Sequence, residues 1–134
     1  MSKRLGENIK MAAALAPATQ SAGTVNGDII ERLGFFDGVT FLSVGVASGA
    51  PSAQGVALKV QHGDAADGSD MADVTGATIA ALTADNTTGE LDLDLNSFKR
   101  YLRVVATITF TGGTAPKIPV SVSIALGNSI STPV

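Results

Sequence analysis

Apolar and polar residues alternate with a period of two along most of the chain after residue 28. The clearest case is residues 90–95, where leucines alternate with acidic side chains, and residues 100–111 and 118–126 repeat the alternation over longer runs. Successive side chains of a β-strand point to opposite faces of its sheet. The pattern therefore predicts strands that bury one face and leave the other in water.

Shorter runs of the same kind predict further strands. They cover residues 28–33, 39–47, 56–62, 71–74 and 78–83. Turn-forming runs such as ADNTTG and TGGTAPK separate the strands, and the glycines and proline of TGGTAPK predict an antiparallel hairpin between the last two long strands. Seven or eight strands at a spacing of about ten residues predict an all-β protein, an antiparallel β-sandwich of jelly-roll type.

The first 27 residues lack this alternation and are rich in small residues. Leu5, Ile9 and Ala13 recur every four residues, as on one face of a short helix that Pro17 would end. This segment is expected to be an extended N-terminal arm.

The chain is thus expected to divide into an arm (1–27), a sandwich domain (28–127) and a C-terminal tail (128–134). The arm is either a frayed end or a segment that orders against a neighbouring subunit. In the second case its apolar contacts are Leu5, Ile9 and Met11.

The composition limits the classes of partner that the protein is expected to bind. The 134 residues carry a net charge of -3, so no positive field attracts nucleic acid. No apolar run approaches the roughly 20 residues of a membrane span, and the short MAAALAPA run, with Glu7 and Asn8 interrupting the basic residues before it, is a poor secretory signal. Only 16% of residues are charged while 45% are hydrophobic, which favours a protein whose surface is partly covered by partners.

The residues that could carry chemistry do not form a catalytic set. His62 is the single histidine and there is no cysteine, so neither a nucleophile triad nor a His-rich metal site can be built, and no cofactor is expected. Four aspartates recur every third residue in GDAADGSDMADV and could ligate Ca²⁺, but the run does not match the known calcium loop. The simpler interpretation is a turn in which Asp side chains accept backbone N–H groups.

Acidic and basic residues meet in LDLDLNSFKRYLRVV, residues 91–105. Glu90, Asp92 and Asp94 lie on one face of one strand without an apolar pocket, which favours the wet face of an edge strand over a pair of catalytic carboxylates. The basic residues that follow could pair with these acids if the chain turned at Asn96, although this would send Arg100 inward. Alternatively, the chain crosses between sheets at residues 96–98 and Arg100 stays in water.

A resemblance to a known family rests on four segments. They are Asp73 to Ala77 (D-V-x-G-A), Leu91 to Val105 (a Leu/Asp strand followed by K-R-Y-L-R-V-V), Phe110 to Val120 (F-T-G-G-T-x-P-x-I-P-V) and Leu126-Gly127. Together they resemble small virion proteins encoded among the head genes of tailed bacteriophages. The resemblance covers about residues 24–127 and leaves out the arm.

The resemblance implies a structural protein and not an enzyme, namely a decoration or cement protein that binds and reinforces the assembled capsid. It implies the major capsid protein as partner, a homotrimer, and a place on the capsid exterior after synthesis in the host cytoplasm. A head fibre, neck or tail component is the alternative within the virion. A carbohydrate-binding adhesin is a further alternative, although the chain has no tryptophan and a single tyrosine to stack on sugars.

Overall fold

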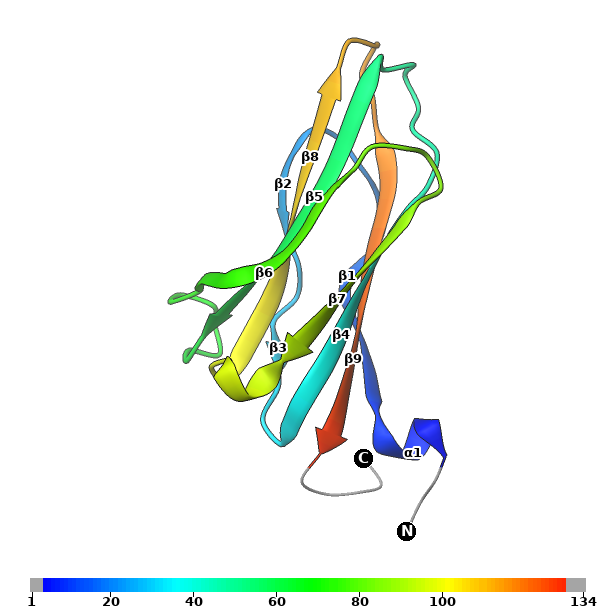
Figure 1. Cartoon of the computed structure of the whole chain (residues 1–134). Helices are drawn as coiled ribbons and strands as arrows, with labels where there is room; N and C mark the ends of the chain where they lie inside the picture. Colours follow the sequence, from blue (N-terminus) through cyan, green and yellow to red (C-terminus); the bar gives the residue numbers. More distant parts are fainter. Residues whose placement is uncertain (1–3, 130–134) are drawn as a thin grey trace.

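A computed structural model describes residues 4–129 of the chain (Figure 1). Apart from one turn of helix and one of 3₁₀ helix, its regular elements are strands. They are α1 (Leu5–Asn8), β1 (Lys10–Gln20), β2 (Gly23–Asn26), β3 (Ile30–Glu31), β4 (Phe35–Val44), β5 (Ala53–Gly63), β6 (Ala72–Leu82), β7 (Thr88–Asp94), η1 (Leu95–Ser97), β8 (Tyr101–Thr111) and β9 (Ile118–Ser129).

The strands form two antiparallel sheets that face each other. One, here sheet A, has the order β1-β9-β4-β7; the other, sheet B, has the order β2-β8-β5-β6, with the two-residue β3 also paired to β8. Without β3, this is the order of an eight-stranded jelly roll, in which the strands of two Greek keys alternate between the sheets. The fold is an antiparallel β-sandwich of jelly-roll type, as the sequence predicts.

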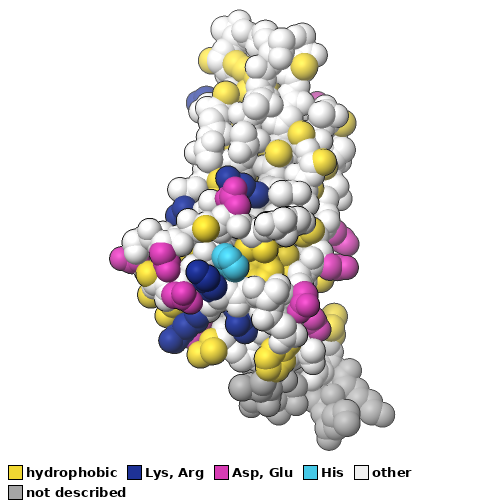
Figure 2. Space-filling model, turned by 60° about the vertical axis from the view of Figure 1, so that its left-hand side comes forward, with side chains coloured by type: hydrophobic (Ala, Val, Ile, Leu, Met, Phe, Trp, Pro, Cys, Tyr) yellow, Lys and Arg dark blue, Asp and Glu magenta, His cyan; other side chains and the backbone are white. Residues whose placement is uncertain are grey.

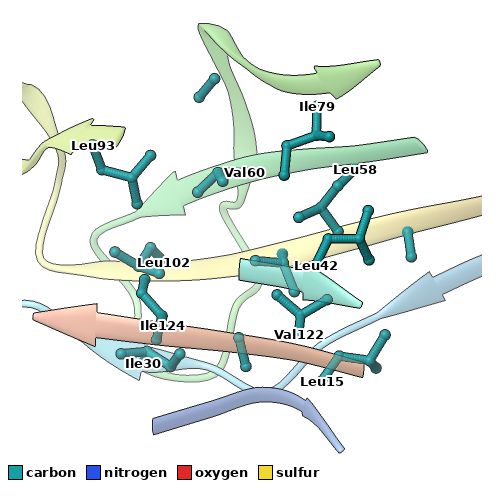
Figure 3. Packing of buried hydrophobic residues seen from close by; sticks show 14 of the residues in the cluster. Leu15, Ile30, Leu42, Leu58, Val60, Ile79, Leu93, Leu102, Val122 and Ile124 are labelled. Carbon is teal, nitrogen blue, oxygen red and sulfur yellow. The ribbon is translucent and has the colours of Figure 1, made fainter. Parts of the chain in front are cut away.

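The core lies between the two sheets and is built from one face of each. In sheet A the inward residues of β4 and β9 are neighbours in register, as Leu42 is with Val122. In sheet B, Val60 faces Val104 across the β5/β8 pair. Leucine, isoleucine and valine from both sheets interdigitate in this layer (Figure 3), as expected of the inward halves of alternating strands.

The predicted hairpin between the last two strands is wrong. β8 pairs with β2, β3 and β5 in sheet B, whereas β9 pairs with β1 and β4 in sheet A. The TGGTAPK run therefore connects the two sheets instead of closing one. Alternation and turn residues predict strand ends well, but both arrangements bury the same faces, so the pattern could not distinguish them.

The prediction of an arm outside the sandwich is also wrong for most of residues 1–27. β1 is an edge strand of sheet A paired with β9, and β2 pairs with β8. The expected helix is reduced to α1, because Ile9 and the residues after it are extended. Residues 1–3 lie outside the described residues.

Irregular register in β1 explains why the pattern failed there. The pairing with β9 shifts between Ala13 and Leu15, and again between Leu15 and Ala18. As a result Ala14 and Leu15, adjacent in sequence, are both buried. Two β-bulges in eleven residues remove the period of two that identifies a strand.

A glycine after β2 lies where an edge of sheet B meets an edge of sheet A. The Gly27 amide donates to the Val104 carbonyl oxygen at 2.8 Å, and the next amide, that of Asp28, donates to the Ala14 carbonyl oxygen at 2.9 Å. A Cβ atom at Gly27 would overlap the carbonyl oxygen of Ala14 and lie 2.9 Å from Cγ2 of Val104. Only glycine fits where the two sheets are joined this closely.

The other edge of sheet B is irregular as well. The two predicted strands at residues 71–74 and 78–83 are one strand, β6, whose pairing with β5 jumps from Thr78 to Asp73 while β5 advances only from Lys59 to Gln61. Gly76, at φ +81°, lies within this wide bulge. The D-V-x-G-A segment therefore forms a distorted edge that resists pairing with another strand.

The remaining boundaries differ by small amounts. The strand expected at residues 28–33 is only β3, and the tail expected from residue 128 begins later, since β9 continues to Ser129. The rest of the predicted tail, residues 130–134, lies outside the described residues.

Candidate interaction surface

His62, at the end of β5, makes contacts that connect β5 to the segment before β8. Its Nδ1 accepts the backbone N–H of Lys99 at 3.2 Å, and its ring meets Phe98 edge to face with 5.6 Å between centroids. Burial lowers the pKa of His62, the nearby Lys99 lowers it further, and Asp64 opposes the shift. Figure 2 shows Lys, Arg and acidic side chains gathered around this single histidine.

The aspartates of the loop between β5 and β6 bind backbone amides, as the turn interpretation predicts. Asp70 accepts the N–H groups of Asp64 at 2.9 Å and Ala65 at 3.1 Å, and Asp67 accepts that of Ser69 at 2.9 Å. These hydrogen bonds favour the ionised form and lower the pKa values of Asp67 and Asp70. Asp73 instead accepts hydrogen bonds from Lys59 and Gln61 on the neighbouring strand.

The junction in LDLDLNSFKRYLRVV is a crossing between sheets. β7 belongs to sheet A and β8 to sheet B, and η1 connects them with the Asn96 amide donating to Asp94 at 3.2 Å. The alternative that the chain turns and pairs these residues is wrong. Arg100 remains in water, where its guanidinium meets Glu31 at 3.0 Å and the ring of Tyr101; the contact with Glu31 raises the pKa of Arg100.

The outward face of sheet A presents a groove along β9. Between residues 121 and 127, the residues of β9 that alternate with its buried face are all small, so the middle of the sheet is low. From one end of the groove to the other they are Gly127, Ala125, Ser123 and Ser121. Because neighbouring strands lie about 4.8 Å apart, the larger side chains of β4 rise along one side of this floor, and that of Met11 on β1 rises on the other side at the Gly127 end.

Apolar side chains form both walls. On the β4 side, Val39 is opposite Ala125 and Phe41 is opposite Ser123, with exposed fractions of 37% and 39%. On the other side, Met11 is opposite Ala125 and is 59% exposed. The space at the Gly127 end is a shallow hollow of about 350 Å³, lined by Ile9, Asp37, Gly38, Val39, Asp92, Leu93, Ala125 and Gly127.

The three proposed contact residues lie at this end of the molecule. Met11 belongs to the β1 wall, and half-buried Ile9 lies next to Gly127, whose Cβ position is 3.4 Å from the Ile9 Cγ2 atom. Leu5, on α1, is 71% exposed; Figure 1 shows α1 beside the end of β9. The structure thus brings Ile9 and Met11 into one surface and places Leu5 beyond its end.

The β4 wall and the floor were missed by the sequence reasoning. The alternation that identifies β9 also identifies its other face, and a run of small residues on that face was a usable signal. The wall could not be found in the same way, because Val39 and Phe41 appear in a strand that is apolar on both faces, which is also typical of a strand buried on both sides.

The described residues offer neither a metal-ligand cluster nor a membrane-spanning helix. Residues 4–129 contain no group of three or more His, Asp or Glu side chains placed to hold a metal ion. Within the same residues, no helix is long and apolar enough to cross a membrane.

Comparison with known proteins shows the fold and no family. No protein-family model matches the chain, and no curated protein matches it. Among solved structures, VP2 of infectious bursal disease virus, from a subviral particle, superimposes with a TM-score of 0.50 at 16% identity. The match covers 90% of this chain but 32% of VP2, and it shows a shared fold.

Two other solved structures are similar at lower scores. The prophage-derived protein YomS of SPBc2 has a TM-score of 0.45 at 13% identity, covering 90% of this chain and 94% of YomS. A pilus protein of Bacillus endospore appendages has a TM-score of 0.44 at 14% identity, covering 91% and 90%.

Proposed function

We propose that this chain is a structural, non-enzymatic protein of a tailed-phage virion that binds the assembled capsid as a decoration protein. The observation that carries the proposal is the groove of sheet A, an exposed apolar surface on a protein with few charges. A jelly roll suits this role, since the fold is common in viral capsid domains and VP2, which shares it, comes from a subviral particle. The four sequence segments that resemble phage head proteins support the same assignment.

The contact residues Leu5, Ile9 and Met11 fit this proposal in a modified form. They are not part of a free arm: Ile9 and Met11 border the groove, and Leu5 extends the apolar surface beyond it. Deleting residues 1–20 would therefore remove β1 and expose the buried edge of β9, so such a deletion cannot test binding alone. Point substitutions on the surface are the appropriate test.

The deciding experiment measures how much of the protein each virion contains and where it lies. Cryo-electron microscopy and quantitative mass spectrometry of purified particles should find it on the capsid exterior in proportion to the capsid subunits, as trimers. A small fixed number of copies at one vertex would instead identify a neck, tail or head-fibre component. Absence from particles, with binding to cell-surface glycans, would replace the proposal by an adhesin.

The contact surface is tested by Leu5→Ser and Met11→Ser in particle-binding assays. Each is expected to weaken binding several-fold, because each removes an exposed apolar side chain that would be buried against the shell. Val46→Ser is the matched control, since Val46 is 56% exposed but lies past the opposite end of β4. Equal binding of Met11→Ser and Val46→Ser would exclude the β1 wall from the contact.

A further inference from the structure

One side of the groove in sheet A carries uncompensated negative charge. Beyond the β4 wall, three of the four outward residues of β7 are acidic: Glu90, Asp92 and Asp94, with Thr88 as the fourth. Asp37 continues this acidic rim on β4, directly opposite Asp94 in the antiparallel pair. Like charges at opposite positions of a strand pair repel each other, so this arrangement is unfavourable in the isolated chain.

No cation of the described chain relieves the acidic rim. Within residues 4–129, none of its four carboxylates forms an ion pair, and their polar contacts are Asn128 on Asp37 and the Asn96 amide on Asp94. Three basic side chains form ion pairs with acids outside the rim: Lys59 with Asp73, Lys99 with Asp64, and Arg100 with Glu31. Lys10 is the only basic residue in the strands of sheet A. It directly precedes Met11 in β1, so strand alternation places the two side chains on opposite faces.

The charge pattern decides between possible occupants of the groove. A second copy that used the same face about a two-fold axis would bring like surfaces together, and the acidic rims of both copies would add to the repulsion. An occupant with apolar side chains for the groove and cations for the rim would remove this repulsion while burying Val39, Phe41 and Met11. The occupant therefore presents apolar and basic side chains, whereas this face of the protein presents apolar and acidic ones.

The sheet geometry also sets the spacing of these groups. The floor on β9 and the acidic residues of β7 are separated by two strand spacings, about 9.6 Å at 4.8 Å each. In an extended partner segment this distance lies between two residues, about 6.6 Å, and four residues, about 13 Å, and only residues an even number apart point to the same face. A partner would thus carry Arg or Lys two or four residues from the side chain that enters the groove.

We infer that the groove of sheet A binds a protein segment in which an apolar side chain is flanked by Arg or Lys two or four residues away, on a protein other than this chain. The apolar side chain lies over Ala125 and Gly127, between Met11 and Val39, and the cation meets Asp92 and its neighbours in the rim. The identification of the partner as the capsid shell rests on the proposed function. The side chains expected in the partner segment are inferred from the groove alone.

The test uses the full chain labelled with ¹⁵N and two synthetic peptides. The first has a central Leu with Arg two and four residues away on each side, and the second has Glu in place of each Arg. In NMR titrations the Arg peptide should shift the amide signals of Gly38, Ala125 and Gly127, and the Glu peptide should bind much more weakly. Binding of the Arg peptide should weaken as salt rises, because exposed charges are screened within a Debye length of about 10 Å at 0.1 M.

Substitutions in the protein then locate the contact. Asp92→Asn should weaken binding of the Arg peptide about two- to fivefold, which is the range for one exposed ion pair, while Asp28→Asn, an exposed acid outside the groove, should leave it unchanged. Val39→Ser should weaken binding of either peptide relative to Val46→Ser. Thermal unfolding of each variant confirms that the fold is intact.

Three results would overturn the inference: no binding of the Arg peptide at millimolar concentration, equal binding of both peptides, or binding that Asp92→Asn and Val39→Ser leave unchanged. These outcomes are independent of the particle experiment. A protein absent from virions that still binds the Arg peptide through this groove would refute the proposed function and keep the inference. A protein found on capsids that binds neither peptide would support the proposed function and refute the inference.

Discussion

Thr40 offers a direct test of how the core of sheet A is built. It lies in the middle of β4, opposite Leu91 on one side and Ile124 on the other, and it is fully buried. Its hydroxyl has no hydrogen-bond partner among the described residues. Transferring a hydroxyl from water to an apolar site without a partner costs about 1–3 kcal/mol in proteins.

Thr40→Val replaces this hydroxyl by a methyl group of similar size. We expect the free energy of unfolding to rise by about 1–2 kcal/mol, since the substitution removes the desolvation cost and leaves no cavity. With an unfolding entropy of about 2.1 cal/mol/K per residue, the 134-residue chain gains about 3.5 °C in Tm per kcal/mol, or roughly 4–7 °C in all.

Urea unfolding followed by far-ultraviolet circular dichroism, at one fixed protein concentration, measures the change. Val122→Thr is the matched control, because Val122 is buried on the same face of the adjacent strand β9 and the substitution adds the hydroxyl that Thr40→Val removes. It should lower the free energy of unfolding by about 1–3 kcal/mol. A Thr40→Val variant no more stable than the parent would show that the hydroxyl is satisfied in the folded state and that this reasoning is wrong.

Three further predictions concern other parts of the fold. Gly27→Ala should lower the free energy of unfolding by about 1–3 kcal/mol through overlap with Ala14, whereas Gly6→Ala, with open space around it, should not; urea unfolding compares them. Asp70, whose folded pKa is lowered, should stabilise its loop above the unfolded value near 3.9 and lose this effect as pH falls through the folded pKa; protection of the Asp64 and Ala65 amides from hydrogen exchange, taken relative to the intrinsic exchange rate at each pH, should therefore fall in acid, and Asp70→Asn should abolish that change in protection. Asp37→Asn should raise Tm slightly at low salt and less at high salt, because it relieves repulsion from Asp94; an unchanged Tm at low salt would contradict the unfavourable pairing.

The sequence predicts strands where alternation is uninterrupted and fails where it is broken. β5, β7 and β8 were placed within a few residues because their polar and apolar faces differ clearly. β1 was missed because its two bulges put Ala14 and Leu15 on the same side, and β6 was divided in two at the bulge around Gly76. A local pattern contains no information on which sheet a strand joins, so the hairpin between β8 and β9 was predicted wrongly.

The candidate surface was predictable only in part. The predicted contacts are the apolar residues Leu5, Ile9 and Met11 of a segment that lacks strand alternation. Their role in binding a partner stays a prediction. Val39, Phe41 and the floor of the groove become neighbours of Met11 only through the order β1-β9-β4, which joins segments from both ends of the chain. The opposition of Asp37 and Asp94 likewise depends on a register that the sequence alone does not determine.

The position of β9 between β1 and β4 has a consequence for how the protein is made. β1 leaves the ribosome before every other strand of the sandwich, yet its strand partner is the last of these strands to do so. Until β9 has emerged, β1 and β4 have no neighbour on their shared side, and sheet A cannot close. The domain should therefore acquire its structure only once β9 has emerged, and at the slow pace typical of folds dominated by distant pairings. Even a small deletion that shortens β9 would leave two separated strands exposed to aggregation.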